Sequence, residues 1–281
     1  ASGFSIINKE TIIIYKDLVS ASEFIKSSSY KDLFSKKFIN SRDNTFACIG
    51  HSRLVTNGSQ EDQNNNHPLL CNSIVGVHNG IIVNNDQLWD QNKNLKRKYK
   101  VDSEIIFSLI DEYLKKEESI EKSVLHAFEK IIGQASIASF SKLLDIIILY
   151  SNNGSLYMAT NKENEFIVFA SEKVIIKYFL KLRRFKKIFG SFNIQKVISN
   201  TGYIIDLQTL EQTKISKNKN KKNYHRIRKT IEIKPKKVKR SLSNNYKPSV
   251  TIKAIPEDFK NHINIENKEI DSIKRCKKCI L

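Results

Sequence analysis

Two apolar runs of this chain each end in a cluster of polar residues. The runs Thr45–Val55 and Ser73–Val77 are rich in β-branched and apolar residues, which predicts two buried strands. A guanidinium can pair with a carboxylate, and amide or glycine N–H groups can donate hydrogen bonds to an oxyanion. Because buried strands hold such groups on a rigid scaffold, we place a candidate site where the two runs end. The polar residues that end the runs are His51, Arg53, Thr56, Asn57, His78, Asn79 and Gly80.

Three of the candidate features also have a purely structural interpretation. Arg53 could be a surface ion-pair partner. Asp102 could be the N-cap of the helix that it begins. Asn79-Gly80 is the commonest dipeptide of hairpin turns. Taken singly, none of these features establishes a function.

Histidine and cysteine spacing gives little support for metal or disulfide chemistry. His67 and His78 are interpreted as packing or hydrogen-bonding residues, because no metal-ligand spacing accompanies them. Cys48 and Cys71 stand alone, which does not suggest a disulfide framework. No apolar run approaches the ~18 residues of a membrane span, and no signal peptide opens the chain. We therefore expect a cytoplasmic protein without a membrane partner.

The positive charge of the chain is concentrated in one segment. The 281 residues carry a formal net charge of +19, and residues 212–253 hold 15 Lys or Arg and a single acid, Glu232. Residues 254–281 hold six basic and five acidic residues, which leaves +4 for residues 1–211. The basic segment is interpreted as a solvated linker rather than as a nucleic-acid surface.

The order of the predicted elements indicates an α+β fold. Strands are followed by helices and then by further strands, so sheets should pack together with helices outside them. Beyond residue 209 the periodicity fades into the basic segment. The predicted elements are a hairpin over 3–16, helices over 20–40, 84–95, 102–116 and 120–132, four strands between 135 and 170, a helix over 172–182, and a hairpin over 196–207.

Four motifs resemble those of class II glutamine amidotransferases, whose glutaminase domain is an N-terminal-nucleophile hydrolase. Residues 50–58 read G-H-S-R-L-V-T-N-G, where the family has G-H-T-R-W-A-T-H-G. Residues 64–68 read N-N-N-H-P, and residues 77–88 read V-H-N-G-I-I-V-N-N-D-Q-L, similar to the family's N-A-H-P and V-H-N-G-I-I-E-N-Y-E-E-L. Residues 101–104 read V-D-S-E, similar to T-D-T-E at the start of a helix. The resemblance covers about residues 1–211.

The resemblance implies a four-layer α-β-β-α sandwich of two antiparallel sheets, with L-glutamine as the substrate. Arg53 would bind the α-carboxylate of glutamine, Asp102 its α-ammonium, and Thr56 would line the pocket. The catalytic residues Asn79 and Gly80 would supply a side-chain and a backbone N–H to an oxyanion hole. No cofactor is implied for this domain.

The nucleophile of the family does not stand at the matching position. The family uses an N-terminal cysteine whose free α-amine acts as its base. Residue 1 is Ala, and neither Cys48 nor Cys71 lies in a matching motif. Because the first three residues resemble the end of a later family motif, R-G-P-D-x-S-G, we expect a few tens of residues, including the cysteine, to precede Ala1. This chain itself should be inactive. Leu54 and Asn57 replace an aromatic residue and a histidine of the family motif, so the pocket should differ in shape at these two positions.

The part of the protein that uses the released ammonia must lie after residue 211. Residues 274–281 resemble the start of the N-acetyl sugar amidotransferases of surface-polysaccharide synthesis, which are similar to ATP-dependent PP-loop enzymes. This implies a downstream synthetase domain of the same polypeptide, with ATP and Mg²⁺. Cys276 and Cys279 would be half a zinc site at most. The predicted domains are a glutaminase domain without its first strand (1–211), a basic linker or weakly structured segment (212–270) and the start of a truncated synthetase domain (271–281).

Other functions remain open. One is an asparagine-synthetase-like enzyme, and another is a glucosamine-6-phosphate-synthase-like enzyme, which the glutaminase motifs favour. A non-enzyme alternative is a relic that binds glutamine or associates with nucleic acid through the basic segment. Homo-oligomer formation is also left open.

Overall fold

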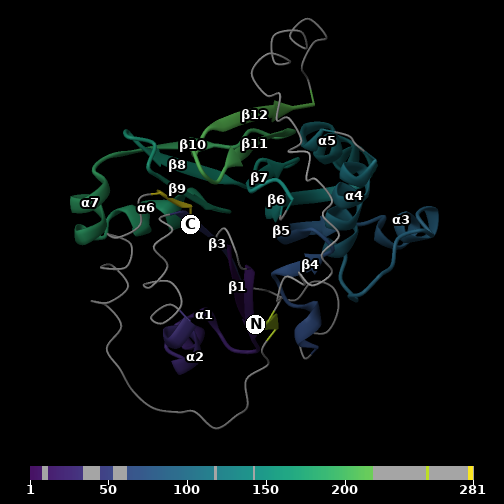
Figure 1. The fold of residues 1–281 in the computed structure, drawn as a ribbon, viewed down its shortest axis with the longest axis horizontal. Coiled ribbons are helices and arrows are strands. Elements are labelled where there is room, and N and C mark those ends of the chain that lie inside the picture. The colour runs from purple at the N-terminus through teal and green to yellow at the C-terminus, as the bar shows by residue number, and fades with distance from the viewer. Residues whose placement is uncertain are drawn as a thin grey trace, which may run out of the picture.

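Two β-sheets form the centre of the molecule, and segments far apart in the sequence lie side by side in them (Figure 1). The computed structural model describes residues 1–7, 12–33, 45–52, 62–116, 119–141, 143–217, 251–252 and 278–280. Across the larger, eight-stranded sheet the order is β10 (Phe192–Lys196), β8 (Tyr157–Asn161), β9 (Phe166–Ala170), β14 (Lys278–Ile280), β3 (Thr45–Ser52), β1 (Ser2–Ile7), β2 (Ile12–Asp17) and β13 (Thr251–Ile252). Across the six-stranded sheet it is β12 (Gln212–Ser216), β11 (Thr201–Asp206), β7 (Ile146–Ser151), β6 (Gly133–Ser141), β5 (Ile74–Ile82) and β4 (Leu69–Cys71).

Most neighbouring strands are antiparallel, as predicted. The exceptions are the two short strands late in the chain: β13 runs parallel to β2, and β14 runs parallel to both β3 and β9. Regular structure continues past residue 211, where the predicted glutaminase domain ends. β12 pairs with β11 along Gln212–Ser216, so the folded unit continues through the start of the segment that was interpreted as a linker.

Alternate residues of the strands fill the space between the sheets. In β6, Ala138 and Phe140 contribute to the core between the sheets, whereas Ala135 and Ile137 face the helices. Both faces of this strand are therefore buried, which is why its sequence lacks the polar alternation of a half-exposed strand. Ile49 of β3 belongs to the same central core, so the core joins the two sheets.

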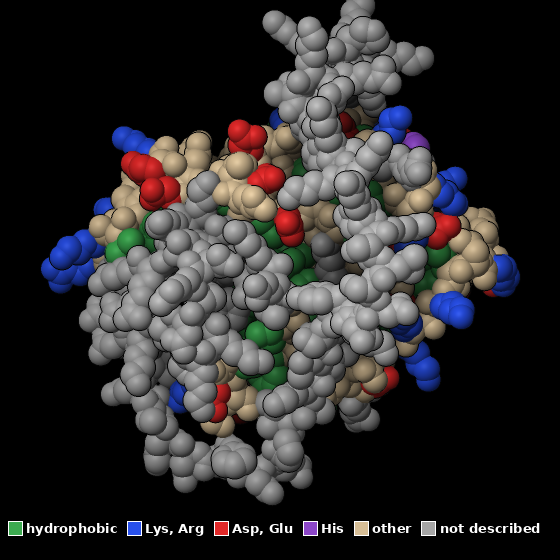
Figure 2. Space-filling model, in the orientation of Figure 1, with side chains coloured by type: hydrophobic (Ala, Val, Ile, Leu, Met, Phe, Trp, Pro, Cys, Tyr) green, Lys and Arg blue, Asp and Glu red, His purple; other side chains and the backbone are tan. Residues whose placement is uncertain are grey.

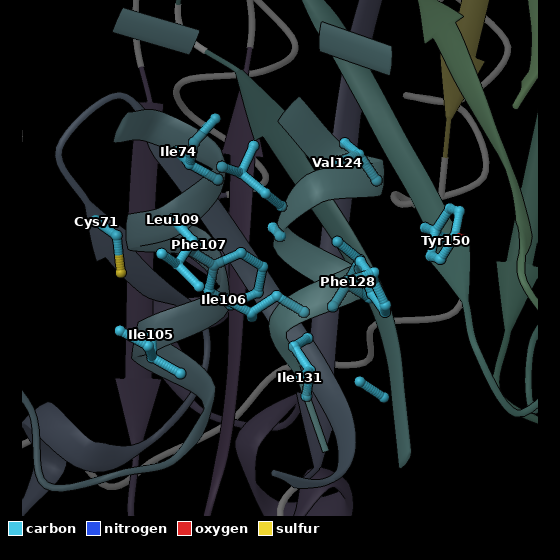
Figure 3. Close-up of a cluster of buried hydrophobic side chains, with 14 of the residues drawn as sticks. Cys71, Ile74, Ile105, Ile106, Phe107, Leu109, Val124, Phe128, Ile131 and Tyr150 are labelled. Carbon is cyan, nitrogen blue, oxygen red and sulfur yellow. The ribbon is translucent and has the colours of Figure 1, made fainter. Parts of the chain in front are cut away.

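Two helices cover the outer face of the six-stranded sheet, α4 (Ser103–Lys115) and α5 (Ile120–Lys130). Figure 3 shows side chains of α4 and α5 meeting between the helices, with Phe128 directed toward Tyr150 of β7. The two ring centroids are 4.3 Å apart. The short helix α3 (Asn85–Gln91) adds Leu88 and Trp89 to the same cluster. The predicted helices over 84–95, 102–116 and 120–132 are therefore confirmed.

The outer face of the eight-stranded sheet is covered in two places. α1 (Ala21–Phe24) packs Phe24 against Phe4 and Tyr15, and α6 (Lys173–Leu180) and α7 (Arg183–Phe189) pack on the β8–β10 end. The layers are thus helix, sheet, sheet and helix, as predicted. None of the helices in the described ranges is long and apolar enough to cross a membrane.

The predicted helix over 20–40 is divided by Ser27. The Ser27 hydroxyl donates to the Phe24 carbonyl at 2.8 Å and accepts the Tyr30 N–H at 3.2 Å. It thereby ends the first turn of helix and caps the next helix, α2 (Ser28–Asp32). Residues 34–40 of the predicted helix lie outside the described residues.

The predicted hairpin over 196–207 is wrong. β10 and β11 follow one another in sequence but belong to different sheets, because β10 pairs with β8 and β11 pairs with β7. Between β10 and β11 the chain crosses from one sheet to the other, and there the Val197 N–H donates to the Leu156 carbonyl at 2.9 Å.

Candidate functional site

The two predicted polar clusters meet beside the ends of β3 and β5. His51 of β3 contacts His67, with ring centroids 4.5 Å apart. In the β4–β5 pair Leu69 lies opposite Gly76, so His67 approaches the end of β5 that carries His78 and Asn79. Arg53, Thr56 and Asn57 lie outside the described residues. Three of the five predicted site residues can therefore be placed: Asn79, Gly80 and Asp102.

Asn79 stands at the open end of the core between the sheets. It lies on the same face of β5 as Val75 and Val77, which are buried in that core, but Asn79 itself is exposed. Its side chain makes no hydrogen bond to any other residue that the structure describes. An exposed amide with free N–H donors is a suitable ligand for an anionic oxygen.

Gly80 is required by backbone geometry, and not by a hairpin turn. Asn79-Gly80 lies inside β5, so the interpretation of this dipeptide as a turn is wrong. The φ angle of Gly80 is 143°, and a Cβ at this position would lie 1.9 Å from the Gln134 carbonyl oxygen of β6. A side chain is excluded both by φ and by this contact. The absent side chain leaves the backbone of residue 80 open to close approach.

Asp102 is a buried carboxylate at the start of α4. It occupies the N-cap position, but its side chain makes no capping hydrogen bond to α4. Instead, Oδ2 accepts the Ile82 N–H of β5 at 2.8 Å, and Oδ1 accepts the Ser103 hydroxyl at 3.3 Å. Only 4% of Asp102 is exposed, and it forms no ion pair within the described part of the chain. A buried carboxylate without a cation is costly unless a ligand supplies the charge.

His78 directly precedes the Asn79-Gly80 segment in β5. It is buried, and its Nδ1 lies 2.8 Å from the Ser103 hydroxyl. Burial lowers the pKa of His78 below its usual value, although the Asp102 carboxylate and the Gln134 carbonyl oppose this shift. Among the described residues, no three His, Cys, Asp or Glu side chains gather as a metal site would require.

The Asn64–Pro68 segment is held by contacts from several elements. Lys16 of β2 donates to the Asn66 carbonyl at 2.7 Å, and burial lowers the pKa of Lys16 to about 8. The Asn65 side chain accepts the Lys100 N–H at 2.8 Å. Gly3 of β1 approaches the His67 carbonyl so closely that a Cβ would lie 2.3 Å from it. The segment is thus fastened beside the end of β5.

Neither cysteine whose side chain is described has the properties of a nucleophile. Burial raises the pKa of the Cys48 thiol to about 12 and raises that of Cys71 further. Cys71 lies between β4 and α4, where its thiol points at the Glu104 carbonyl, 3.9 Å away. Cys276 lies outside the described residues, and the side chain of Cys279 in β14 is not described.

Sequence reasoning missed Lys16, Ser103 and Glu104. Glu104 accepts the N–H groups of Lys98 and Tyr99, both at 2.7 Å, and so ties the loop before α4 to the helix. Ser103 and Glu104 complete the V-D-S-E motif, which was the available signal for them. Lys16 lies at the end of an apolar strand and carries no local signal.

Comparison with known proteins agrees with the resemblance of the motifs. Residues 51–178 match the family described as glutamine amidotransferase domain. The glutamine–fructose-6-phosphate aminotransferase of Buchnera aphidicola is 27% identical over 268 residues, which are 87% of this chain and 40% of the relative. The Clostridium acetobutylicum enzyme of the same name is 32% identical over 123 residues, 42% of this chain and 20% of its own. The chain therefore spans less than half of these relatives.

Solved structures share the fold. A structure described as the allosteric regulatory enzyme of purine biosynthesis has a TM-score of 0.57 and 18% identity, covering 78% of this chain and 43% of its own. The glutamine phosphoribosylpyrophosphate amidotransferase of B. subtilis has a TM-score of 0.50 and 16% identity, covering 78% and 44%. Residues 51–178 therefore match a glutamine amidotransferase domain, and the chain has the fold of these two solved enzymes. In such an amidotransferase domain, the end of β5 and the start of α4 are the described parts of the candidate glutamine site.

Proposed function

We propose that this chain is the glutamine-binding unit of a glutamine-dependent amidotransferase, which hydrolyses glutamine to glutamate and ammonia. The observation that carries the proposal is the buried Asp102 carboxylate, which has no cationic partner among the described residues and accepts the Ile82 N–H, two residues from Gly80. An α-ammonium would neutralise this carboxylate. The exposed Asn79 amide would then face the carbonyl end of the same ligand.

The remaining roles follow from the chemistry of an amino-acid substrate. Arg53 would pair with the α-carboxylate, and Thr56 would line the pocket. The Asn79 side chain and the Gly80 N–H would stabilise the tetrahedral oxyanion. Loss of one such donor costs about 2.7–4 kcal/mol of transition-state stabilisation in a serine protease. Support comes from the exposure of Asn79 and from the close backbone approach that Gly80 allows.

A thiolate nucleophile is needed to break the amide. In the mechanism that the resemblance implies, the thiolate attacks the glutamine amide carbon, ammonia leaves, and water hydrolyses the thioester to glutamate. Of the cysteines whose side chains are described, the half-buried Cys48 and the buried Cys71 have thiol pKa values raised by desolvation and do not fit this role. We infer that this chain binds glutamine but releases no ammonia by itself.

The acceptor of the ammonia is proposed to be a sugar derivative, amidated or aminated by a downstream domain. The resemblance of residues 274–281 to the start of N-acetyl sugar amidotransferases supports ATP-dependent amidation of a surface-polysaccharide sugar, with ATP and Mg²⁺ bound by that domain. The names of the relatives favour a second candidate, fructose 6-phosphate. Mass spectrometry of products from the natural full-length protein separates the two: the first requires ATP with glutamine, and the second requires fructose 6-phosphate with glutamine.

Glutamine binding is tested by isothermal titration calorimetry of the 281-residue chain. We expect saturable binding of L-glutamine, much weaker binding of D-glutamine, and no ammonia release in a coupled glutamate dehydrogenase assay. Absence of L-glutamine binding by the folded chain would refute the proposal. Ammonia release would refute the inference that the chain lacks a nucleophile.

A further inference from the structure

A buried hydrogen-bonded network joins β5 to the first turn of α4. It runs from His78 Nδ1 to the Ser103 hydroxyl at 2.8 Å, and from that hydroxyl to Asp102 Oδ1 at 3.3 Å. The other oxygen of Asp102 returns to β5 through the Ile82 N–H at 2.8 Å. All three side chains are at most 4% exposed. The network is therefore shielded from water. Hydrogen bonds to charged groups are stronger in such a buried environment than in water.

The network contacts β5 at His78 and at Ile82, on either side of the predicted oxyanion donors. His78, Gly80 and Ile82 lie on the face of β5 that is turned toward the helices, because alternate residues of a strand share a face. His78 is held at one end of this segment and Ile82 at the other. Gly80 lies between them, and a Cβ there would be 3.0 Å from His78 Nε2. The path of the backbone at Asn79-Gly80 is thus fixed from both sides by groups on α4.

We propose that His78 and Ser103 are positioning residues that hold the Asp102 carboxylate and the Asn79-Gly80 segment in one rigid unit. This inference rests on the proposed function, in which Asp102 binds the ammonium of glutamine and Asn79-Gly80 stabilises the oxyanion. The network sets the distance between these two subsites. This distance would match the separation between the α-ammonium and the side-chain amide of glutamine.

The protons of the network have one consistent arrangement. The Ser103 hydroxyl donates to Asp102, so it accepts the Nδ1–H of His78. In this Nδ1–H tautomer Nε2 carries no proton, which agrees with the absence of a hydrogen-bond partner for Nε2 among the described residues. Each donor points toward the Asp102 carboxylate. This direction stabilises the anionic form that an α-ammonium requires.

The test compares two ligands that differ only in the α-ammonium group. One is L-glutamine and the other is 5-amino-5-oxopentanoate, which retains the amide and the carboxylate. Removing the Ser103 hydroxyl in Ser103→Ala frees one oxygen of Asp102. We expect this variant of the 281-residue chain to lose roughly three- to tenfold in affinity for L-glutamine, with the affinity for the analogue unchanged within about twofold. Ser108→Ala, which removes another buried hydroxyl of α4, is the matched control and should leave both affinities unchanged.

Each outcome decides between positioning and general support of the fold. Equal losses for both ligands, or no loss for either, would overturn the inference while leaving glutamine binding by the wild type intact. If the wild type itself binds no glutamine, the proposed function fails first and the inference falls with it.

A measurement on the wild type covers the case in which Ser103→Ala does not fold. In ¹⁵N-histidine-labelled chain, His78 should show the neutral Nδ1–H tautomer. Its signals should shift when L-glutamine is added, but not when the analogue is added. A His78 ring that is protonated at Nε2 alone, or that responds equally to both ligands, would contradict the inference.

Discussion

Asp102 and Ile82 connect α4 to β5 through a hydrogen bond of 2.8 Å between a carboxylate oxygen and a backbone N–H. The bond crosses from the helix layer to the sheet next to the Asn79-Gly80 segment. Asp102 is buried. In the proposed function its carboxylate has two separable roles: it accepts a hydrogen bond from the sheet, and it supplies a charge for the ligand.

Asp102→Asn separates these two properties. The amide oxygen of Asn can still accept the Ile82 N–H, but the negative charge is lost. We expect a melting temperature within about 4 °C of the wild type and an affinity for L-glutamine reduced roughly ten- to hundredfold. Asp102→Ala, which also removes the acceptor, should lower the melting temperature further. Unchanged affinity in a folded Asp102→Asn chain would show that Asp102 has no part in the ammonium subsite.

Gly80→Ala should destabilise the chain more than the same change at Gly190. Both glycines have positive φ, 143° and 69°, but a Cβ at Gly190 meets nothing within 4 Å, whereas a Cβ at Gly80 lies 1.9 Å from Gln134 O. We expect Gly190→Ala to cost about 1 kcal/mol and Gly80→Ala at least about 3 kcal/mol. Urea denaturation of the two variants measures the difference. Equal costs would mean that φ alone, and not the contact with β6, restricts residue 80.

Lys16 should make the stability depend on pH above neutrality. Burial lowers its pKa to about 8 in the folded chain, whereas an unfolded lysine titrates near about 10.4. Between these values the unfolded chain binds more protons, so the contribution of Lys16 to the free energy of unfolding rises with pH from about 8 to about 10.4 and falls as pH returns through 8.

The measurement compares the wild type with Lys16→Met by urea denaturation at several pH values across this window. The wild type should gain stability relative to Lys16→Met as the pH rises. Lys93→Met is the control, because Lys93 is 77% exposed and, among the described residues, forms an ion pair with the exposed Asp90 alone. Parallel pH profiles for the wild type and Lys16→Met would show that the Lys16 ammonium is not desolvated.

Much of the fold can be predicted from the sequence, because apolar residues recur at regular spacing along many of its helices and strands. The helices α4 and α5 carry apolar residues at helical spacing, and β7 and β9 are short, mostly apolar runs between turns. The end of the domain was not predictable in the same way. Residues 196–207 contain two short runs separated by Asn200-Thr201, which locally resemble a hairpin, and only the tertiary pairing with β7 and β8 separates them.

For the site, motif order predicts candidate residues but not the contacts between them. Asp102 and Asn79-Gly80 were identified from their motifs, whereas the alternatives of a helix cap and a turn could be rejected only from coordinates. Local sequence favours both alternatives, since Asp precedes a helix and Asn-Gly is a turn dipeptide. The network through Ser103 and His78 depends on how α4 lies on β5, and no spacing along the chain encodes that contact.

The packing of α4 on β5 also predicts a compensating pair. Gly76 of β5 lies under Phe107 of α4, and a Cβ on residue 76 would be 2.3 Å from the Phe107 ring. Gly76→Ala should therefore overpack the interface and cost about 2–3 kcal/mol, and Phe107→Leu should cost roughly 1–2 kcal/mol by leaving space in the core. In the double variant the smaller side chain accommodates the new methyl group, so its cost should be less than the sum of the two by about 1 kcal/mol or more. Urea denaturation of the four chains gives this coupling directly. Additive costs would mean that the ring of Phe107 moves aside freely, and that α4 is held on the sheet by its polar contacts to β5 rather than by this apolar contact.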